Sequence, residues 1–146
     1  MKEIIEQLES FVSTIPGLVK AINETEFCYK EAPDKWSKKE ILGHLVDSAA
    51  NNHQRFIRVQ YEDTPSIVYE QNKWVQLNNY QHLDSNHIIA LWELYNRHLI
   101  WVIRQIPEAD LQRIGRVDEG RIVTLQHLIE WYMEHMEHHL KQIIEL

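Results

Sequence analysis

The chain has 146 residues, 44% of them hydrophobic, with 15 lysines and arginines against 22 aspartates and glutamates. A formal net charge of −7 repels phosphate backbones and anionic lipid surfaces, so neither nucleic acid nor a membrane is an expected partner. The length suits one core, and we expect residues 1–146 to form one domain. A single cysteine, no signal-peptide core and no 18-residue apolar run together favour a cytoplasmic protein.

Four long segments carry apolar residues at helical spacing. A kink is expected in the first at Pro16-Gly17. Ser37 opens the second with a capping-box pattern, and Thr124 suits the N-cap of the fourth. The third ends before Pro107, because the residue preceding a proline avoids the α region. The predicted helices are residues 2–23, 37–60, 85–106 and 124–146.

The connections between these helices differ in length and composition. Residues 62–84 lack sustained periodicity and predict a long loop with a short helical turn, and loops of this length in compact domains are usually functional. Residues 113–117 and 121–123 flank Asp118-Glu119-Gly120, which suits a tight reversal with glycine at positive φ, so a short hairpin is expected before the fourth helix. The predicted fold class is all-α, an up-and-down type four-helix bundle with a long crossover between helices two and three.

Nine histidines are present, and their helical positions separate them. His135 and His139 are four residues apart, so on a helix they stack on one face, beside the apolar stripe of the fourth helix. His138 and His127 fall on the opposite, outer side. On the second helix, His44 lies at the edge of the apolar stripe and can face the bundle. His53 falls away from that stripe and is interpreted as a surface residue, whereas His98 on the third helix, near the inward line of Leu91, Tyr95, Leu99 and Val102, is a reserve candidate.

The pattern of three inward histidines favours a metal site. Any one of them alone is better explained as a core-edge histidine with a hydrogen-bond partner. A pair at i, i+4 joined by a third favours a divalent cation, and three nitrogen ligands with an open position resemble catalytic geometry for Zn or Ni. A zincin is excluded because Met136 stands where its motif needs glutamate, and a di-iron bundle because Glu-x-x-His repeats are absent from the sequence.

Two stretches carry a resemblance to a known family. Residues 35–48, with tryptophan and serine entering the second helix ahead of His44-Leu45, and residues 124–142, with the ending His135-x-x-His138-His139-x-x-Gln142, resemble the DinB/YfiT-like superfamily over nearly the whole chain. The resemblance implies a four-helix bundle in which His44, His135 and His139 hold a divalent metal. It also implies a metal-dependent hydrolase, or a transferase that adds a low-molecular-weight thiol as co-substrate to a small electrophile, and a homodimer.

Two versions of the chemistry stay open for a small-molecule substrate. The metal either lowers the pKa of a bound water for hydrolysis or binds a thiolate for transfer. Asp47, one turn after His44, is the candidate catalytic residue for orienting a ligand or moving a proton, the alternative being a solvated helix acid. Tyr69, Trp74 and His98 are the candidate substrate-binding residues, although loop aromatics often only cover a core edge. A non-catalytic metal- or ligand-binding bundle is the alternative function.

Overall fold

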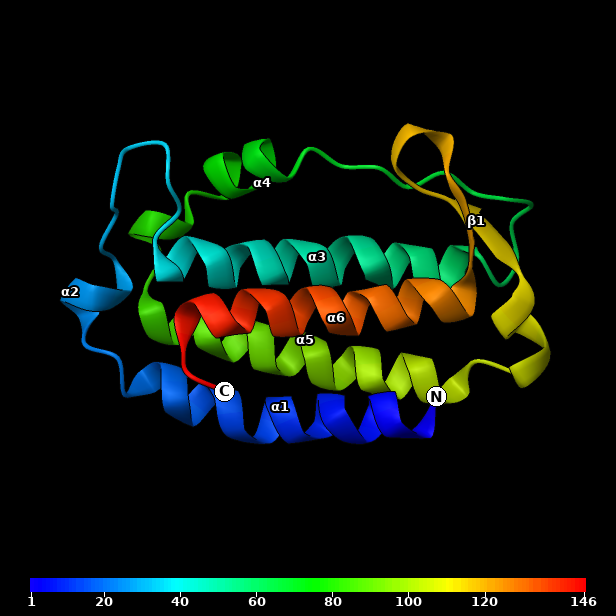
Figure 1. Ribbon diagram of the computed structural model, residues 1–146, viewed down its shortest axis with the longest axis horizontal. Helices are drawn as coiled ribbons and strands as arrows, with labels where there is room; N and C mark the ends of the chain where they lie inside the picture. The colour runs from blue at the N-terminus through cyan, green and yellow to red at the C-terminus, as the bar shows by residue number, and fades with distance from the viewer.

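The computed structural model describes residues 1–118 and 120–146, and it is a bundle of four long helices with a long connection lying over one of them (Figure 1). The bundle helices are α1 (Lys2–Lys20), α3 (Lys38–Arg58), α5 (Ser85–Gln105) and α6 (Leu125–Ile143). The shorter helices and strands are α2 (Glu24–Phe27), α4 (Gln71–Asn78), β1 (Ile114–Arg116) and β2 (Ile122–Thr124), with 3-10 turns η1 (Tyr80–His82), η2 (Glu108–Gln112) and η3 (Asp118–Gly120). The predicted helical class and the hairpin before the last helix are confirmed.

The order of the helices in space follows from the long crossover. α1 and α6 run in one direction, and α3 and α5 run in the other (Figure 1). α3 packs against both α5 and α6, and α1 packs mainly against α5. Because α3 and α5 are parallel, the chain has to return along the bundle between them, which residues 59–84 do. The long crossover is therefore confirmed, and it breaks the strict up-and-down alternation at this step.

The helix boundaries are determined by the capping residues and the proline in the sequence. Ser37 Oγ accepts from the Glu40 amide at 3.1 Å and the Glu40 carboxylate accepts from the Ser37 amide at 2.9 Å, which completes the capping box at the start of α3. Thr124 Oγ1 accepts from the His127 amide and caps α6. Gly120 has a φ of 82° in the hairpin reversal, as expected, while Glu119 lies outside the described residues.

The first predicted helix is too long at its C-terminal end. α1 ends at Lys20, and Asn23 caps the separate short helix α2, which was not predicted. α1 also continues through Pro16 as one uninterrupted helix. The carbonyl of Val12, which an amide at position 16 would normally satisfy, instead accepts from Arg97 Nη2 of α5 at 3.5 Å. A neighbouring helix thus compensates part of the proline's missing hydrogen bond.

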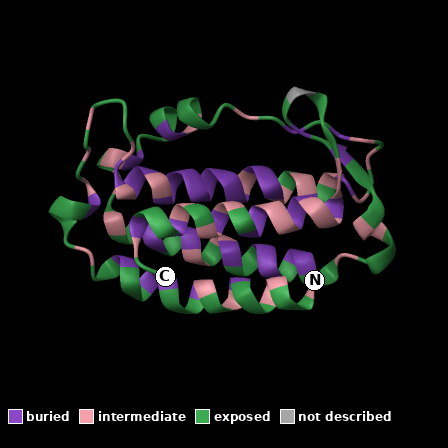
Figure 2. Ribbon diagram, viewed as in Figure 1, coloured by how far each residue is buried: buried purple, intermediate pink, exposed green. Residues whose placement is uncertain are grey.

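The crossover contains more helix than expected, and it buries α3 on a second face. The predicted loop holds the eight-residue α4 and the turn η1, both of which pack against α3. Figure 2 shows α3 buried along most of its length, whereas α1 alternates buried and exposed positions. The Tyr80 ring lies directly over Gly43, where a Cβ atom would overlap it. None of the helices in the described chain combines the length and apolarity that a membrane span requires.

Candidate metal centre

His135 and His139 lie one turn apart on α6, with ring centroids separated by 4.6 Å. The neighbouring helix α3 contributes His44, whose ring centroid lies 4.9 Å from that of His135 and 4.8 Å from that of His139. One ring nitrogen from each residue lies within 4.8 Å of the other two. The fold therefore brings together the three histidines that the sequence analysis selected, from segments 91 residues apart in the chain.

Hydrogen bonds hold two of these rings in orientations suited to a metal. His139 Nδ1 donates to Gln142 Oε1 at 2.9 Å, and His135 Nδ1 lies 3.4 Å from Ser48 Oγ. Both contacts leave the Nε2 atom free to act as a ligand, because outer hydrogen bonds select which nitrogen carries the proton. The buried His44 ring packs against Trp36 at a centroid distance of 4.9 Å, and its Nδ1 has no partner among the described residues.

The spacing and protonation of the rings fit a divalent cation. The Nε2 atoms of His44 and His135 are 3.0 Å apart, close to the roughly 3.4 Å expected for two nitrogens on one tetrahedral zinc ion. Burial, followed by the neighbouring His135 and His139, lowers the pKa of His44 to about 3. Burial, followed by His139, lowers the pKa of His135 to about 4. Both rings are therefore neutral near pH 7 and have lone pairs available for a metal.

A cavity of about 630 Å³ opens beside the histidines, between α3, α6, the crossover and the hairpin. Its lining includes Ser48, Asn52 and Arg55 from α3, Tyr69 from the crossover, and Tyr132 and His135 from α6. His135 thus faces both the histidine cluster and this cavity. A small molecule in the cavity would lie next to a metal held by the cluster, which is the arrangement of a substrate site beside an open coordination position.

A family model for the DinB superfamily matches residues 7–143. The chain belongs to the DinB superfamily. Two relatives of this DinB chain are BH0277 from Halalkalibacterium halodurans, 24% identical over 140 residues, and YfiT from Bacillus subtilis, 24% identical over 144 residues. The alignments cover 95% and 97% of this chain and 81% of each relative. Both relatives are provisionally named metal-dependent hydrolases.

Solved structures support the same DinB fold. The structure of YfiT, described as having an unusual four-helix bundle topology, matches with a TM-score of 0.87 at 22% identity, covering 97% of this chain and 82% of YfiT. A mycothiol-dependent maleylpyruvate isomerase matches with a TM-score of 0.78 at 13% identity, covering 97% of this chain and 60% of the isomerase. At these identities the likeness shows the architecture, including the crossover bundle described above.

Asp47 of this DinB chain lies in a buried network beneath the crossover. Its Oδ1 accepts from the Tyr80 hydroxyl at 2.6 Å and from Asn78 Nδ2 at 3.1 Å, and Oδ2 is buried with no partner among the described residues. The alternative of a solvated helix acid is therefore wrong, because α4 and η1 cover this face of α3. Burial raises the pKa of Asp47 to about 6, while the hydrogen bond from Tyr80 lowers it. The contacts tie Asp47 to the crossover.

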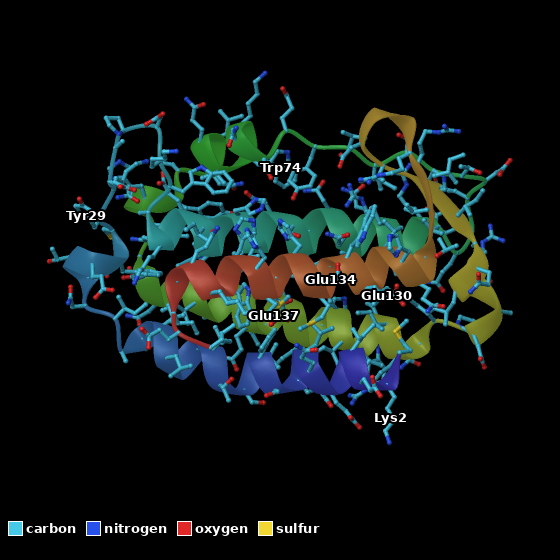
Figure 3. The ribbon with its side chains drawn as sticks, in the orientation of Figure 1. Lys2, Tyr29, Trp74, Glu130, Glu134 and Glu137 are labelled. Carbon is cyan, nitrogen blue, oxygen red and sulfur yellow. The ribbon has the colours of Figure 1, made fainter. Side chains whose placement is uncertain are left out.

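The two candidate aromatics of the crossover have different positions. Tyr69 lines the cavity beside His135, and burial raises the pKa of its hydroxyl, so that it remains a hydrogen-bond donor at neutral pH. Trp74 packs edge-on against Tyr69 at a centroid distance of 5.6 Å and borders an adjoining hollow. In Figure 3, Trp74 on the crossover and Glu134 on α6 lie on opposite sides of α3. Tyr69 is thus at the cavity, and Trp74 supports it from outside.

The inward orientation predicted for His98 is wrong. His98 is exposed on α5, and its ring lies 5.1 Å from that of His53, away from the three-histidine cluster. The buried line of α5 instead runs through Trp92, Asn96 and Leu99. Asn96 can be buried because its Nδ2 donates to the Trp92 carbonyl and its Oδ1 accepts from the Tyr132 hydroxyl. His53, expected at the surface, is half-buried and contacts Tyr95.

A row of polar side chains on α3 was not predicted to be part of the site. Ser48, Asn52 and Arg55 follow His44 at intervals of three or four residues, so they lie along the same side of the helix and line the cavity. The spacing itself was a usable signal, since polar residues in register with a candidate ligand on a largely buried helix require partners.

His138, expected on the outer surface, is exposed at the cavity rim, with Gln142 Nε2 3.4 Å from its Nε2.

Proposed function

We propose that this DinB protein is a metal-dependent enzyme that acts on a small molecule, with His44, His135 and His139 as the metal ligands. The observation that carries the proposal is the convergence of three neutral imidazoles from two helices, one of which, His135, also lines a cavity. The provisional hydrolase names of the relatives support a metal-dependent reaction. The mycothiol-dependent isomerase of similar fold supports a low-molecular-weight thiol as co-substrate.

The roles of the protein groups follow from their contacts. A divalent cation at this site, with zinc or nickel suited to nitrogen ligands, would supply Lewis acidity that activates either water for hydrolysis or a thiol for transfer. Gln142 and Ser48 hold the rings of His139 and His135 in place. The Tyr69 hydroxyl can donate a hydrogen bond to a substrate oxygen in the cavity. Asp47 contributes by holding the crossover, and thereby Tyr69, against α3.

Metal analysis tests the ligand set. Purified wild-type protein incubated with zinc or nickel and then desalted should retain one metal ion per site, and His44→Ala, His135→Ala and His139→Ala should each lose most of it, because three nitrogen ligands are needed. His138→Ala is the matched control, since His138 lies between two ligands on α6 but is exposed outside the cluster. Wild-type protein that stays metal-free under these conditions would contradict the proposal.

Activity assays then separate hydrolysis from thiol transfer. Zinc- or nickel-loaded protein is offered a panel of low-molecular-weight thiols with a generic electrophile, and separately ester and amide probes. Turnover in one assay that disappears in His44→Ala and persists in His87→Ala, which changes an exposed histidine outside the cavity lining, would assign the reaction to this site. Stoichiometric metal binding without turnover in either assay would favour the alternative of a non-catalytic binding bundle.

A further inference from the structure

Arg55 is the cationic side chain of the cavity lining, and protein contacts use only part of its hydrogen-bonding capacity. Its Nε and Nη2 atoms donate to the carbonyl of Ile67 at 3.2 and 2.8 Å, and Nη1 donates to Asn52 Oδ1 at 3.4 Å. A guanidinium group has five N–H donors. Contacts with the described residues use three of them, which leaves one N–H on Nη1 and one on Nη2 for the two oxygens of a carboxylate.

The guanidinium is held in place by the crossover. The Ile67 carbonyl that accepts from Arg55 belongs to a segment paired with the hairpin, since the Ile67 amide donates to the Arg116 carbonyl and the Arg116 amide donates to the Pro65 carbonyl. Arg55 is therefore anchored to backbone that is itself hydrogen-bonded on both sides. A side chain fixed in this way loses little further freedom when it binds a ligand.

Arg55 has no close counterion among the described side chains, whereas three of the other six arginines have one. Arg58, Arg97 and Arg104 each form an ion pair with a glutamate. Among the side chains that the structure describes, no carboxylate forms an ion pair with the Arg55 guanidinium within 4.0 Å; Asp118, an exposed carboxylate of the cavity rim, lies farther away but still raises the pKa of Arg55. Burial lowers the pKa of Arg55, which indicates that its charge is incompletely solvated. Arg55 and His135 line the same cavity, so one ligand in the cavity can contact both.

The remaining charges of the lining favour a ligand with a single carboxylate. Asp118 and Glu134 also border the cavity, but both are exposed, so water screens them more than it screens Arg55. Two acids at the rim would repel a doubly charged phosphate group more strongly than a carboxylate. The aromatic residues Trp131 and Tyr132 provide apolar area for the rest of a small organic acid.

We propose that the substrate of this protein carries a carboxylate that binds the two free N–H groups of Arg55, which directs the rest of the molecule along the cavity towards the three histidines. This inference rests on the proposed function, because it assigns a substrate class to the same site. It is a recognition role for Arg55, separate from metal binding by the histidines.

Binding of 3-phenylpropionate and of its neutral amide, 3-phenylpropionamide, tests the inference by calorimetry or ligand-observed NMR. The two compounds have nearly the same shape, so their difference reports on the carboxylate. We expect wild-type protein to bind the acid about 10- to 100-fold more tightly than the amide, as for hydrogen bonds to charged groups. Arg55→Met should bind the acid and the amide equally well. Arg55→Lys should lower the ratio of acid affinity to amide affinity about tenfold, because lysine lacks the paired donors.

Controls separate recognition by Arg55 from other effects. Arg58→Met, on the same helix but outside this cavity, should bind the acid as wild type does. Circular dichroism and thermal melting check folding, and if Arg55→Met unfolds, Arg55→Lys still gives the decisive comparison. Equal binding of acid and amide, equal loss in Arg58→Met, or tighter binding of inorganic phosphate than of the acid would each overturn the inference.

Metal content is measured in parallel, so that the two proposals fail separately. If binding of 3-phenylpropionate depends on zinc loading but is unchanged in Arg55→Met, the carboxylate binds the metal. That result overturns the inference and leaves the metal site intact. An Arg55-dependent preference for the acid in protein that binds no metal would uphold the inference and overturn the metal-dependent function.

Discussion

Gly43 lies in the interior of α3, where a glycine ordinarily weakens a helix by about 0.5–1 kcal/mol relative to alanine. Here the absence of a Cβ atom makes room for the Tyr80 ring. We expect Gly43→Ala to lower the free energy of unfolding by roughly 1–3 kcal/mol, because overpacking a buried contact outweighs the gain in helix propensity. Urea denaturation measures the change.

The matched control is Gly17→Ala in α1. Gly17 is also inside a helix, but a Cβ atom there would meet nothing within 4 Å. This substitution should raise the free energy of unfolding by up to about 1 kcal/mol. If both alanine variants were stabilised, the tight packing of Tyr80 on α3 would be contradicted.

Asp47 should give the stability of the protein a measurable pH dependence. Its pKa is raised from 3.8 to about 6, chiefly by burial. Between these two values the folded state keeps a proton that the unfolded state has released, so the contribution of Asp47 to the free energy of unfolding falls as pH rises. Asn in its place retains an oxygen for Tyr80 and Asn78 but does not titrate. Relative to wild type, Asp47→Asn should therefore gain stability with rising pH across this window, by up to about 3 kcal/mol.

Urea unfolding of both proteins at several pH values from about 4 to 7 checks this sign. The histidines with lowered pKa values give an opposite slope below their ordinary range, but wild type and variant share them, so the difference between the two isolates Asp47. If the free energy of unfolding of Asp47→Asn minus that of wild type stayed constant or decreased as pH rose, Asp47 would not have a raised pKa.

At the scale of elements, one buried hydrogen bond joins α5 to α6 beside the cavity. The Tyr132 hydroxyl donates to Asn96 Oδ1, and both side chains are buried. Tyr132→Phe would leave the Asn96 oxygen without this donor, and we expect it to lower the free energy of unfolding by about 1–2 kcal/mol. Tyr95→Phe is the control, since Tyr95 is only half-buried, and it should change stability by less than about 0.5 kcal/mol. Equal effects in urea denaturation would refute the importance of the α5–α6 bond.

Most elements are predictable from the sequence because their ends carry local signals. Ser37, Thr124 and Pro107 define helix boundaries through hydrogen bonds and steric restrictions that involve only neighbouring residues. α4 has no such pattern, because Val75 is its only buried residue and one buried position creates no apolar periodicity. The inward face of α5 is misjudged for a different reason. Its burial depends on Asn96, a polar residue whose partner Tyr132 comes from another helix.

The same distinction between local and tertiary signals applies to the candidate site. His135 and His139 are predictable because their spacing places them on one helix face, and the position of His44 on its own helix completes the set. Arg55 is not predictable as a cavity residue, since its orientation depends on the Ile67 carbonyl of the crossover and on the hairpin that fixes it. Helical periodicity contains no information about how the crossover folds back.

At the scale of the whole molecule, a metal held by the three histidines would join α3 to α6, which the crossover, α5 and the hairpin separate in the chain. A ligand that binds only the folded state stabilises it by about 2.7 kcal/mol when its concentration is 100-fold above its dissociation constant. For a chain of this length that corresponds to a rise of roughly 5–10 °C in the unfolding temperature. We expect this rise in calorimetric scans with zinc or nickel, and we expect EDTA to reverse it.

Two neighbouring histidines on α6 decide whether such a rise comes from this site. His139→Ala removes a ligand at the cluster and should abolish most of the metal-induced rise, whereas His138→Ala removes an exposed ring and should preserve it. The comparison is needed because nine histidines give the chain other places where metal ions can bind weakly. Weak binding to scattered histidines would also occur in the unfolded state and would reduce the stabilisation. A rise of equal size in both variants would therefore assign it to scattered histidines and contradict a metal bridge between α3 and α6.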